Sequence, residues 1–156
     1  MCPNNPIGKV DLYMVSHHGT NQSGSEPLVH GLMPRVAVMD NGPRKGGAEQ
    51  TYRVLYSSPG LEDLWQVHWS YPGGLERNPA GLFIANIEDP TALAAFLTAP
   101  PPAPGAGRGA RGGLGGRGGH TGQAFWIKAS AHNDGSFTVT NSRNGFSKTY
   151  PQARER

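Results

Sequence analysis

The apolar positions in the first 70 residues fall into three short runs, each of which predicts a β-strand. The runs occupy residues 9–16, 35–40 and 64–69, and they are rich in β-branched and aromatic residues. The second run is almost continuously apolar, a pattern typical of a strand that is covered on both faces. A fourth apolar segment, at residues 82–87, predicts another strand or an extended segment.

Two short helices are predicted between the first three strands. Ser25 suits the N-cap of the first helix, and Pro34 ends it. The second helix spans about residues 48–56, where Tyr52 and Tyr56 lie four residues apart on one face. Strands that alternate with helices predict an α/β layer with right-handed crossovers. So short a sheet leaves open edges, which other strands or another chain must cover.

The C-terminal part predicts a helix, a linker and a β-hairpin. Asp89 and Pro90 favour the start of a helix that runs to residue 97. Glycine and proline dominate residues 99–122, a composition that indicates a disordered linker. Two β-rich runs then flank Asp134 and Gly135, a dipeptide that favours the turns of hairpins. We therefore expect three regions: residues 1–98, the linker 99–122 and a hairpin tail at residues 123–150.

Composition makes some classes of function less favourable, but it does not identify one. The formal net charge is only +3, so charge gives little support for a nucleic-acid partner. The linker contains Arg108, Arg111 and Arg117 among glycines, as RNA-binding segments do, but no aromatic residue is interleaved with them, which favours a flexible tether. Cys2 is the only cysteine, which excludes an intrachain disulfide and a cysteine-based zinc site.

No segment of the sequence indicates a membrane span or a secretory address. Residues 1–8 are polar and lack the apolar core of a signal peptide. No window approaches the roughly 20 apolar residues that a membrane-spanning helix needs. We therefore expect no membrane span, and the sequence does not indicate a cellular compartment.

The pair His17 and His18, at the end of the first strand, is the strongest candidate for chemistry. Gly19 follows it and permits a sharp change of direction, so both imidazoles can be presented on one loop. Sites are often assembled on loops at strand ends, and neutral imidazole is the most common ligand for zinc. The alternative is that both side chains are solvated or hydrogen-bonded residues of a polar strand end.

The sequence around this pair resembles a known family. Residues 8–70 contain a strand that runs into Ser-His-His-Gly, a serine-bearing loop, a helix that ends at Pro34, and a strand that ends near Gly42. This order is similar to the region around the last metal-binding histidine of metallo-β-lactamase-fold hydrolases, especially the branch of the ComEC hydrolase-like domain. The resemblance implies an α/β fold, namely the C-terminal half of an αββα sandwich.

The resemblance also implies roles for individual residues. His17 takes the position of the final histidine ligand at the second metal of a two-zinc site. His18 is the catalytic candidate, placed to contact a substrate oxygen. Asn41 and Gly42 lie where the family has a glycine turn at the rim of the active site. Relatives often carry Gly-His-Pro further on, whereas this chain has Gly-Gly-Ala at residues 46–48.

A further implication of the resemblance is a missing half. The family's His-x-His-x-Asp-His signature and its bridging aspartate lie upstream of the matched region and do not occur in this chain. A hydrolytic zinc needs three protein ligands and an open position, so this chain supplies at most one or two ligands. We expect a truncated zinc-dependent hydrolase, inactive alone, whose substrate is a small-molecule ester or a phosphoester. Its partner is the missing N-terminal half or another chain that completes the sheet.

Two other functions are compatible with the same residues. The first is a non-catalytic binding or assembly module that pairs its open sheet edge with a partner. The second, ranked below it, is nucleic-acid binding through the arginines of the linker.

Four other titratable residues are weaker candidates for a site. His68 lies between two apolar residues and is expected to be a half-buried strand residue, and His30 is expected on the exposed face of a short helix. Asp11 and Asp40 flank the two best strands and have the chemistry to orient an imidazole. The competing interpretation is a capping or turn role for Asp40 and a solvated side chain for Asp11.

Overall fold

The computed structural model of the chain describes residues 5–87 and 123–153. Four parallel strands form one sheet in the order β1-β2-β3-β4, and three antiparallel strands form a second sheet, the ribbon, in the order β5-β6-β7. The strands of the parallel sheet are β1 (Leu12–Met14), β2 (Val36–Met39), β3 (Asp63–His68) and β4 (Ile84–Asn86). Those of the ribbon are β5 (Ile127–Ala131), β6 (Phe137–Asn141) and β7 (Ser147–Tyr150).

Each connection within the parallel sheet contains helical structure. A 3₁₀ turn, η1 (Ser16–Gly19), and the helix α1 (Glu26–Leu32) join β1 to β2, and α2 (Glu49–Tyr56) joins β2 to β3. The short helix α3 (Gly74–Arg77) and the 3₁₀ turn η2 (Gly81–Phe83) join β3 to β4. Among the helices of the described residues, none is long and apolar enough to cross a membrane.

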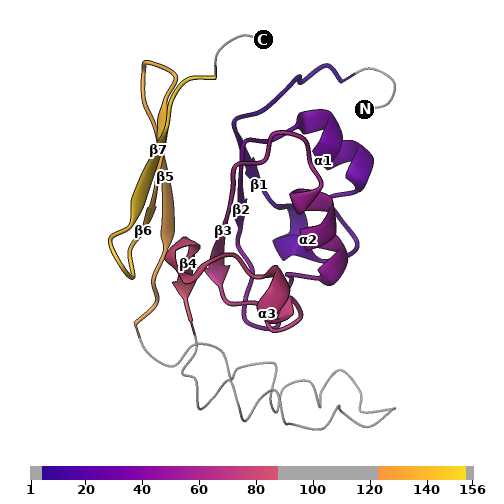
Figure 1. Cartoon of the computed structure of the whole chain (residues 1–156), viewed down its shortest axis with the longest axis vertical. Helices are drawn as coiled ribbons and strands as arrows, with labels where there is room; N and C mark the ends of the chain where they lie inside the picture. Colours follow the sequence, from indigo (N-terminus) through magenta and orange to yellow (C-terminus); the bar gives the residue numbers. More distant parts are fainter. Residues whose placement is uncertain (1–4, 88–122, 154–156) are drawn as a thin grey trace, which may run out of the picture.

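The parallel sheet is the middle layer of three. Figure 1 shows α1 and α2 on one side of it and the ribbon on the other. Strand β2 shows why, because its alternate side chains face opposite sides of the sheet. Ala37 and Met39 pack in the core with the helices, whereas Val36 and Val38 pack in the core with the ribbon. The prediction that this strand is covered on both faces is confirmed.

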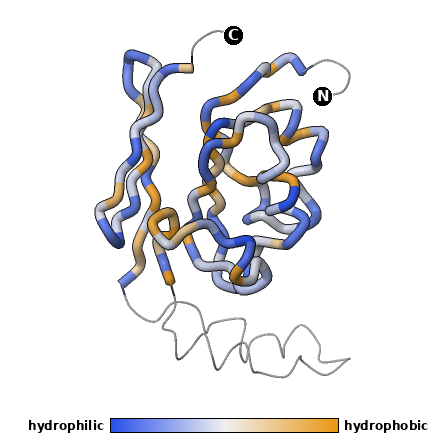
Figure 2. Tube along the Cα trace, viewed as in Figure 1, coloured by the Kyte–Doolittle hydropathy of each residue, from blue (hydrophilic) through white to orange (hydrophobic). Residues whose placement is uncertain are grey.

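The ribbon is attached to the sheet by an aromatic core. Trp65 of β3 is fully buried, and its ring lies 4.9 Å edge-on from Phe83 and 5.6 Å from Phe146, measured between centroids. Phe137 and Tyr150 of the ribbon stack at 4.8 Å in the same core. Figure 2 shows hydrophilic segments at the tips of the ribbon and apolar segments nearer the sheet. The ribbon is therefore amphipathic, with its apolar face inward.

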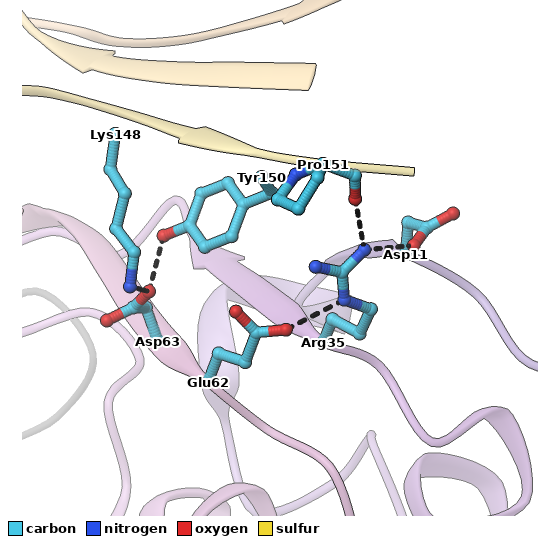
Figure 3. Close-up of polar contacts among 7 residues, drawn as sticks. All are labelled: Asp11, Arg35, Glu62, Asp63, Lys148, Tyr150 and Pro151. Atoms are coloured by element: carbon cyan, nitrogen blue, oxygen red, sulfur yellow. Dashed lines mark hydrogen bonds and ion pairs between the residues drawn. The ribbon is translucent and has the colours of Figure 1, made fainter. Parts of the chain in front are cut away.

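A polar cluster, the Arg35 clamp, joins the ribbon to the amino ends of the strands (Figure 3). The Arg35 guanidinium donates to Asp11 Oδ1 (3.0 Å), to Glu62 Oε1 (2.8 Å) and to the backbone oxygen of Pro151 (2.8 Å). The two carboxylates raise the pKa of Arg35, above all through the hydrogen bond that Arg35 donates to Glu62. The cation thus links four segments of the chain.

Next to the clamp, a nearly buried carboxylate holds the last ribbon strand. Asp63 Oδ2 accepts hydrogen bonds from Lys148 Nζ and from the Tyr150 hydroxyl, the latter at 2.6 Å. The Trp65 indole in turn donates to the Tyr150 hydroxyl at 3.0 Å. Burial, with the hydrogen bond to Asp63, raises the pKa of Tyr150 above its ordinary value.

The predicted α/β class, the first three strands, the first two helices and the Asp-Gly hairpin turn are confirmed. The strand predicted within residues 82–87 is also present, but it covers only residues 84–86, and a 3₁₀ turn precedes it. Ser25 stands at the N-cap of α1, but its side chain makes no capping hydrogen bond. The third ribbon strand and α3 were not predicted. The expected helix after Asp89 and the linker lie outside the described residues.

Candidate functional site

His17 and His18 form a left-handed turn directly after β1. Their backbone φ angles are 50° and 60°, and Gly19 continues the turn at 75°. Histidine visits this region more often than most residues, but the left-handed conformation still costs a residue with a side chain about 1–2 kcal/mol. Two such residues in succession are held only where the surroundings determine the backbone.

The loop before α2 supplies those surroundings. The backbone N–H groups of Gly47 and Ala48 donate to the carbonyl oxygens of His18 (3.1 Å) and Gly19 (2.9 Å), and the Thr51 hydroxyl also donates to Gly19 (2.8 Å). A Cβ atom at Gly46 would lie 1.6 Å from the His18 carbonyl oxygen. The loop therefore needs glycine there in order to approach the histidine turn.

The His18 ring is oriented by the residue that directly follows β2. Its Nδ1 lies 3.0 Å from the backbone oxygen of Asp40 and 3.2 Å from the carboxylate Oδ2 of the same residue. Because a carbonyl oxygen can only accept, Nδ1 carries the hydrogen and donates it. In the neutral form of the ring, the lone pair is then on Nε2, which is the usual arrangement for a metal-binding histidine oriented by a carboxylate. Of the two roles considered for Asp40, the structure shows contact with an imidazole.

The exposed His17 ring has fewer hydrogen-bond contacts than the His18 ring. Its Nδ1 lies 3.2 Å from the Thr20 hydroxyl, and its ring centroid is 6.1 Å from that of His18. Neither Nε2 atom bonds to any residue that the structure describes. The turn therefore presents two neighbouring imidazole nitrogens with no partner among residues 5–87 and 123–153.

These residues fit part of a zinc site. Imidazole nitrogen is a preferred zinc donor, but a hydrolytic zinc needs three protein ligands. Within residues 5–87 and 123–153, no group of three or more His, Cys, Asp or Glu side chains is placed to hold a metal ion. Asp40 is nearby, but its carboxylate contacts the Nδ1 side of His18. The described residues thus offer two donors, and the remainder would have to come from elsewhere.

The other candidate histidines, His30 and His68, form hydrogen bonds that hold elements of the fold together. His68 is half-buried at the end of β3, as predicted, and its backbone bonds to the buried Asn41 side chain, which donates to the His68 carbonyl at 2.8 Å. His30 was expected on an exposed face, which is wrong. Its ring is half-buried between the two helices, where Nε2 lies 3.2 Å from both the Val54 carbonyl and the Ser57 hydroxyl.

The second carboxylate, Asp11, lies at the amino end of the sheet. It pairs with Arg35 in the clamp and so lies away from the histidine turn, which follows the carboxyl end of β1. The expectation that it is a solvated side chain is therefore incomplete, because it takes part in an ion pair. It does not orient either imidazole.

A buried polar network behind the glycine loop was not predicted. The Tyr52 hydroxyl donates to Gln66 (3.0 Å), the Gln66 amide donates to Asn78 (3.0 Å), and the Ser70 hydroxyl donates to the Gly47 carbonyl (3.1 Å). Burial raises the pKa of Tyr52 to about 12. The signal in the sequence was Gln66 within an otherwise apolar strand, because a buried amide needs hydrogen-bond partners.

Comparisons with known proteins give no independent assignment. No protein-family model matches the chain, and no curated protein or solved structure is significantly similar to it.

Proposed function

We propose that this chain is the C-terminal half of a zinc-dependent hydrolase with a metallo-β-lactamase αββα sandwich, and that His17 is a metal ligand. The observation that carries the proposal is the strained turn that presents two imidazoles whose Nδ1 atoms are engaged and whose Nε2 atoms face no described partner. Glycine or asparagine would adopt the same backbone at lower cost. Histidine at both positions therefore indicates a use for the imidazoles.

The two histidines have different tasks in this proposal. His17, exposed and lightly held, binds the second metal. His18, whose ring Asp40 orients, contacts an oxygen of the substrate. Zinc bound at such a site supplies a Lewis acid for the hydrolysis of an ester or phosphoester. Asp40 is a positioning residue, since it acts through the His18 ring.

The open edge of β1 supports an attached half. Strand β1 pairs only with β2, so its outer edge has no partner strand among the described residues. Leu12 and Met14 lie beside Val36 and Val38 on the ribbon side of the sheet, yet 38% and 67% of their surfaces are exposed. The ribbon therefore stops short of β1. A missing half that pairs with this edge would cover both side chains and place further ligands near the histidine turn.

Zinc binding by the full chain tests the proposal. We expect Zn²⁺ to shift the imidazole NMR signals of His17 and His18, and His17→Ala to weaken zinc binding at least about tenfold. Asp40→Asn should weaken it less, because it removes an orienting contact. His132→Ala is the matched control, since the His132 side chain bonds to Thr138 on the ribbon and not to the histidine turn. Zinc binding that His17→Ala leaves unchanged would refute the assignment.

The competing function is a non-catalytic assembly module, which the same open edge favours. In that case β1 pairs with a partner strand and the histidines bind no metal. A Met14→Lys variant separates the two, because a charge on the edge strand opposes strand addition without touching either imidazole. Loss of a co-purifying partner in this variant, together with no zinc binding by the unmodified chain, would establish the assembly function instead.

A further inference from the structure

A pocket of about 350 Å³ lies beside the histidine turn. The roles proposed above for the two histidines do not use this pocket. Ser16, the loop at residues 21–25, Leu28 of α1, and Gln50 and Thr51 at the start of α2 form its walls. The volume lies near the lower end of the roughly 300–1,000 Å³ range of small-molecule sites. The pocket therefore suits a group of about the size of one ring.

The residues that line the pocket are uncharged. Hydroxyl and amide side chains dominate the described residues around it, and Leu28 is its one large apolar side chain. The side chains of Asn21, Gln22, Ser25 and Gln50 bond to no other described residue, so their donors and acceptors are available. Amide and hydroxyl groups both donate and accept, as the hydroxyl groups of a ligand do. An apolar wall such as Leu28 suits the C–H face of a ring.

The surroundings disfavour an anion. No lysine or arginine lines the pocket among the described residues. Glu26 and Glu49 begin the two helices whose first turns border the pocket, and their carboxylates add negative charge near it, although that of Glu49 is paired with Arg77. The chemistry of the walls thus favours a neutral, hydroxyl-rich group over a phosphate.

Some of the residues that line the pocket also form the hydrogen bonds that hold the histidine turn in place. Ser16 directly precedes His17, and its carbonyl accepts a hydrogen bond from the Ser23 hydroxyl at 2.8 Å. On the other side, the Thr51 hydroxyl bonds to the Gly19 carbonyl. A group seated in the pocket would therefore lie directly beside the turn that presents both imidazoles.

We infer that the pocket binds an uncharged, hydroxyl-bearing ring, such as a sugar, and that this group is part of the substrate. The second half of this inference rests on the proposed hydrolase function, whereas the binding itself does not. The ester or phosphoester bond would then lie at the histidine turn, with the sugar group held by Asn21, Gln50 and their neighbours.

Amide NMR shifts of the full chain test the binding, with methyl β-glucoside as the probe. We expect shifts at residues 16, 21–25, 50 and 51, and about tenfold weaker binding in an Asn21→Ala, Gln50→Ala double variant, since each loses a hydrogen bond. The matched control is Gln152→Ala, an exposed glutamine outside the pocket. No shifts with the glucoside, or the same shifts with inorganic phosphate, would overturn the inference.

A His17→Ala variant separates this inference from the proposed function. The His17 side chain does not line the pocket, so glucoside binding should persist in this variant. Glucoside binding by an unmodified chain that binds no zinc would overturn the hydrolase function and keep the sugar pocket. Zinc binding in a chain that does not bind the glucoside would overturn the sugar pocket alone.

Discussion

At the scale of single residues, the sequence predicted the position of His17 and His18 at a strand end, but it did not predict their left-handed backbone conformation. The Ser-His-His-Gly run at a strand end predicted where the two imidazoles lie. Its left-handed conformation depends on residues 46–48, almost thirty residues away, whose backbone amides bond to the turn. In the sequence these residues indicated only the absence of a histidine that the resemblance led us to expect. Their structural role is to allow close approach, which glycine provides by lacking a side chain.

Replacement of Gly46 by alanine tests this role. We expect Gly46→Ala to lower the free energy of unfolding by more than about 2 kcal/mol, because its Cβ would overlap the His18 carbonyl and φ is +81°. Gly60→Ala is the matched control, since Gly60 has a similar φ of +86° but no atom within 4 Å of the added Cβ. Urea denaturation measures both variants. Equal losses in the two variants would show that the contact with the turn is unimportant.

At the scale of elements, periodicity identified most strands and helices, and it failed where an element depends on distant packing. The strand β7 has a mostly polar sequence, and it is ordered by its pairing with β6 and by the contacts of Lys148 and Tyr150 with Asp63. The hairpin itself was predicted from its Asp-Gly turn, but its position on the sheet was not. That position depends on apolar side chains from segments about 100 residues apart, which local patterns do not connect.

Replacing a large apolar side chain on the inner face of the ribbon tests whether the ribbon unfolds together with the rest of the fold. Phe137 is 6% exposed in the aromatic core, so Phe137→Ala should lower the free energy of unfolding by about 3–5 kcal/mol. Leu75→Ala is the control, because Leu75 is 78% exposed and its loss should change stability by less than about 0.5 kcal/mol. Near-ultraviolet circular dichroism during urea denaturation follows both. A separate early transition of the ribbon in the unmodified chain would contradict a single cooperative core.

At the scale of the whole molecule, three tyrosines link stability to alkaline pH. Burial raises the pKa values of Tyr52 and Tyr56 to about 12, and that of Tyr150 above its ordinary value. An unfolded tyrosine titrates near pH 10. Below that pH both states keep these protons, so the stabilisation is complete. Above it the unfolded state releases protons that the folded state retains, and stability falls as the pH rises.

We expect the unfolding midpoint in urea to decrease steadily between pH 10 and pH 12. The shift at Tyr52 corresponds to roughly 3 kcal/mol over this interval, because one pKa unit is about 1.36 kcal/mol. Tyr52→Phe should flatten the pH dependence by about that amount, even though it also removes the hydrogen bond to Gln66 and lowers stability at every pH. An unchanged slope in this variant would mean that the buried hydroxyl is not the titrating group.

The Arg35 clamp has a consequence for the order in which the molecule is made. It joins Arg35 to a carbonyl 116 residues further along the chain, so it closes only when the end of the ribbon is available. During synthesis the helices and the parallel sheet precede the ribbon, and Val36, Val38 and Trp65 then present an uncovered apolar surface. A nascent chain that stalls before Tyr150 is exposed to aggregation through this surface. Ribosome-associated chaperones would therefore be expected to bind the nascent chain at this stage and to leave once the clamp has closed.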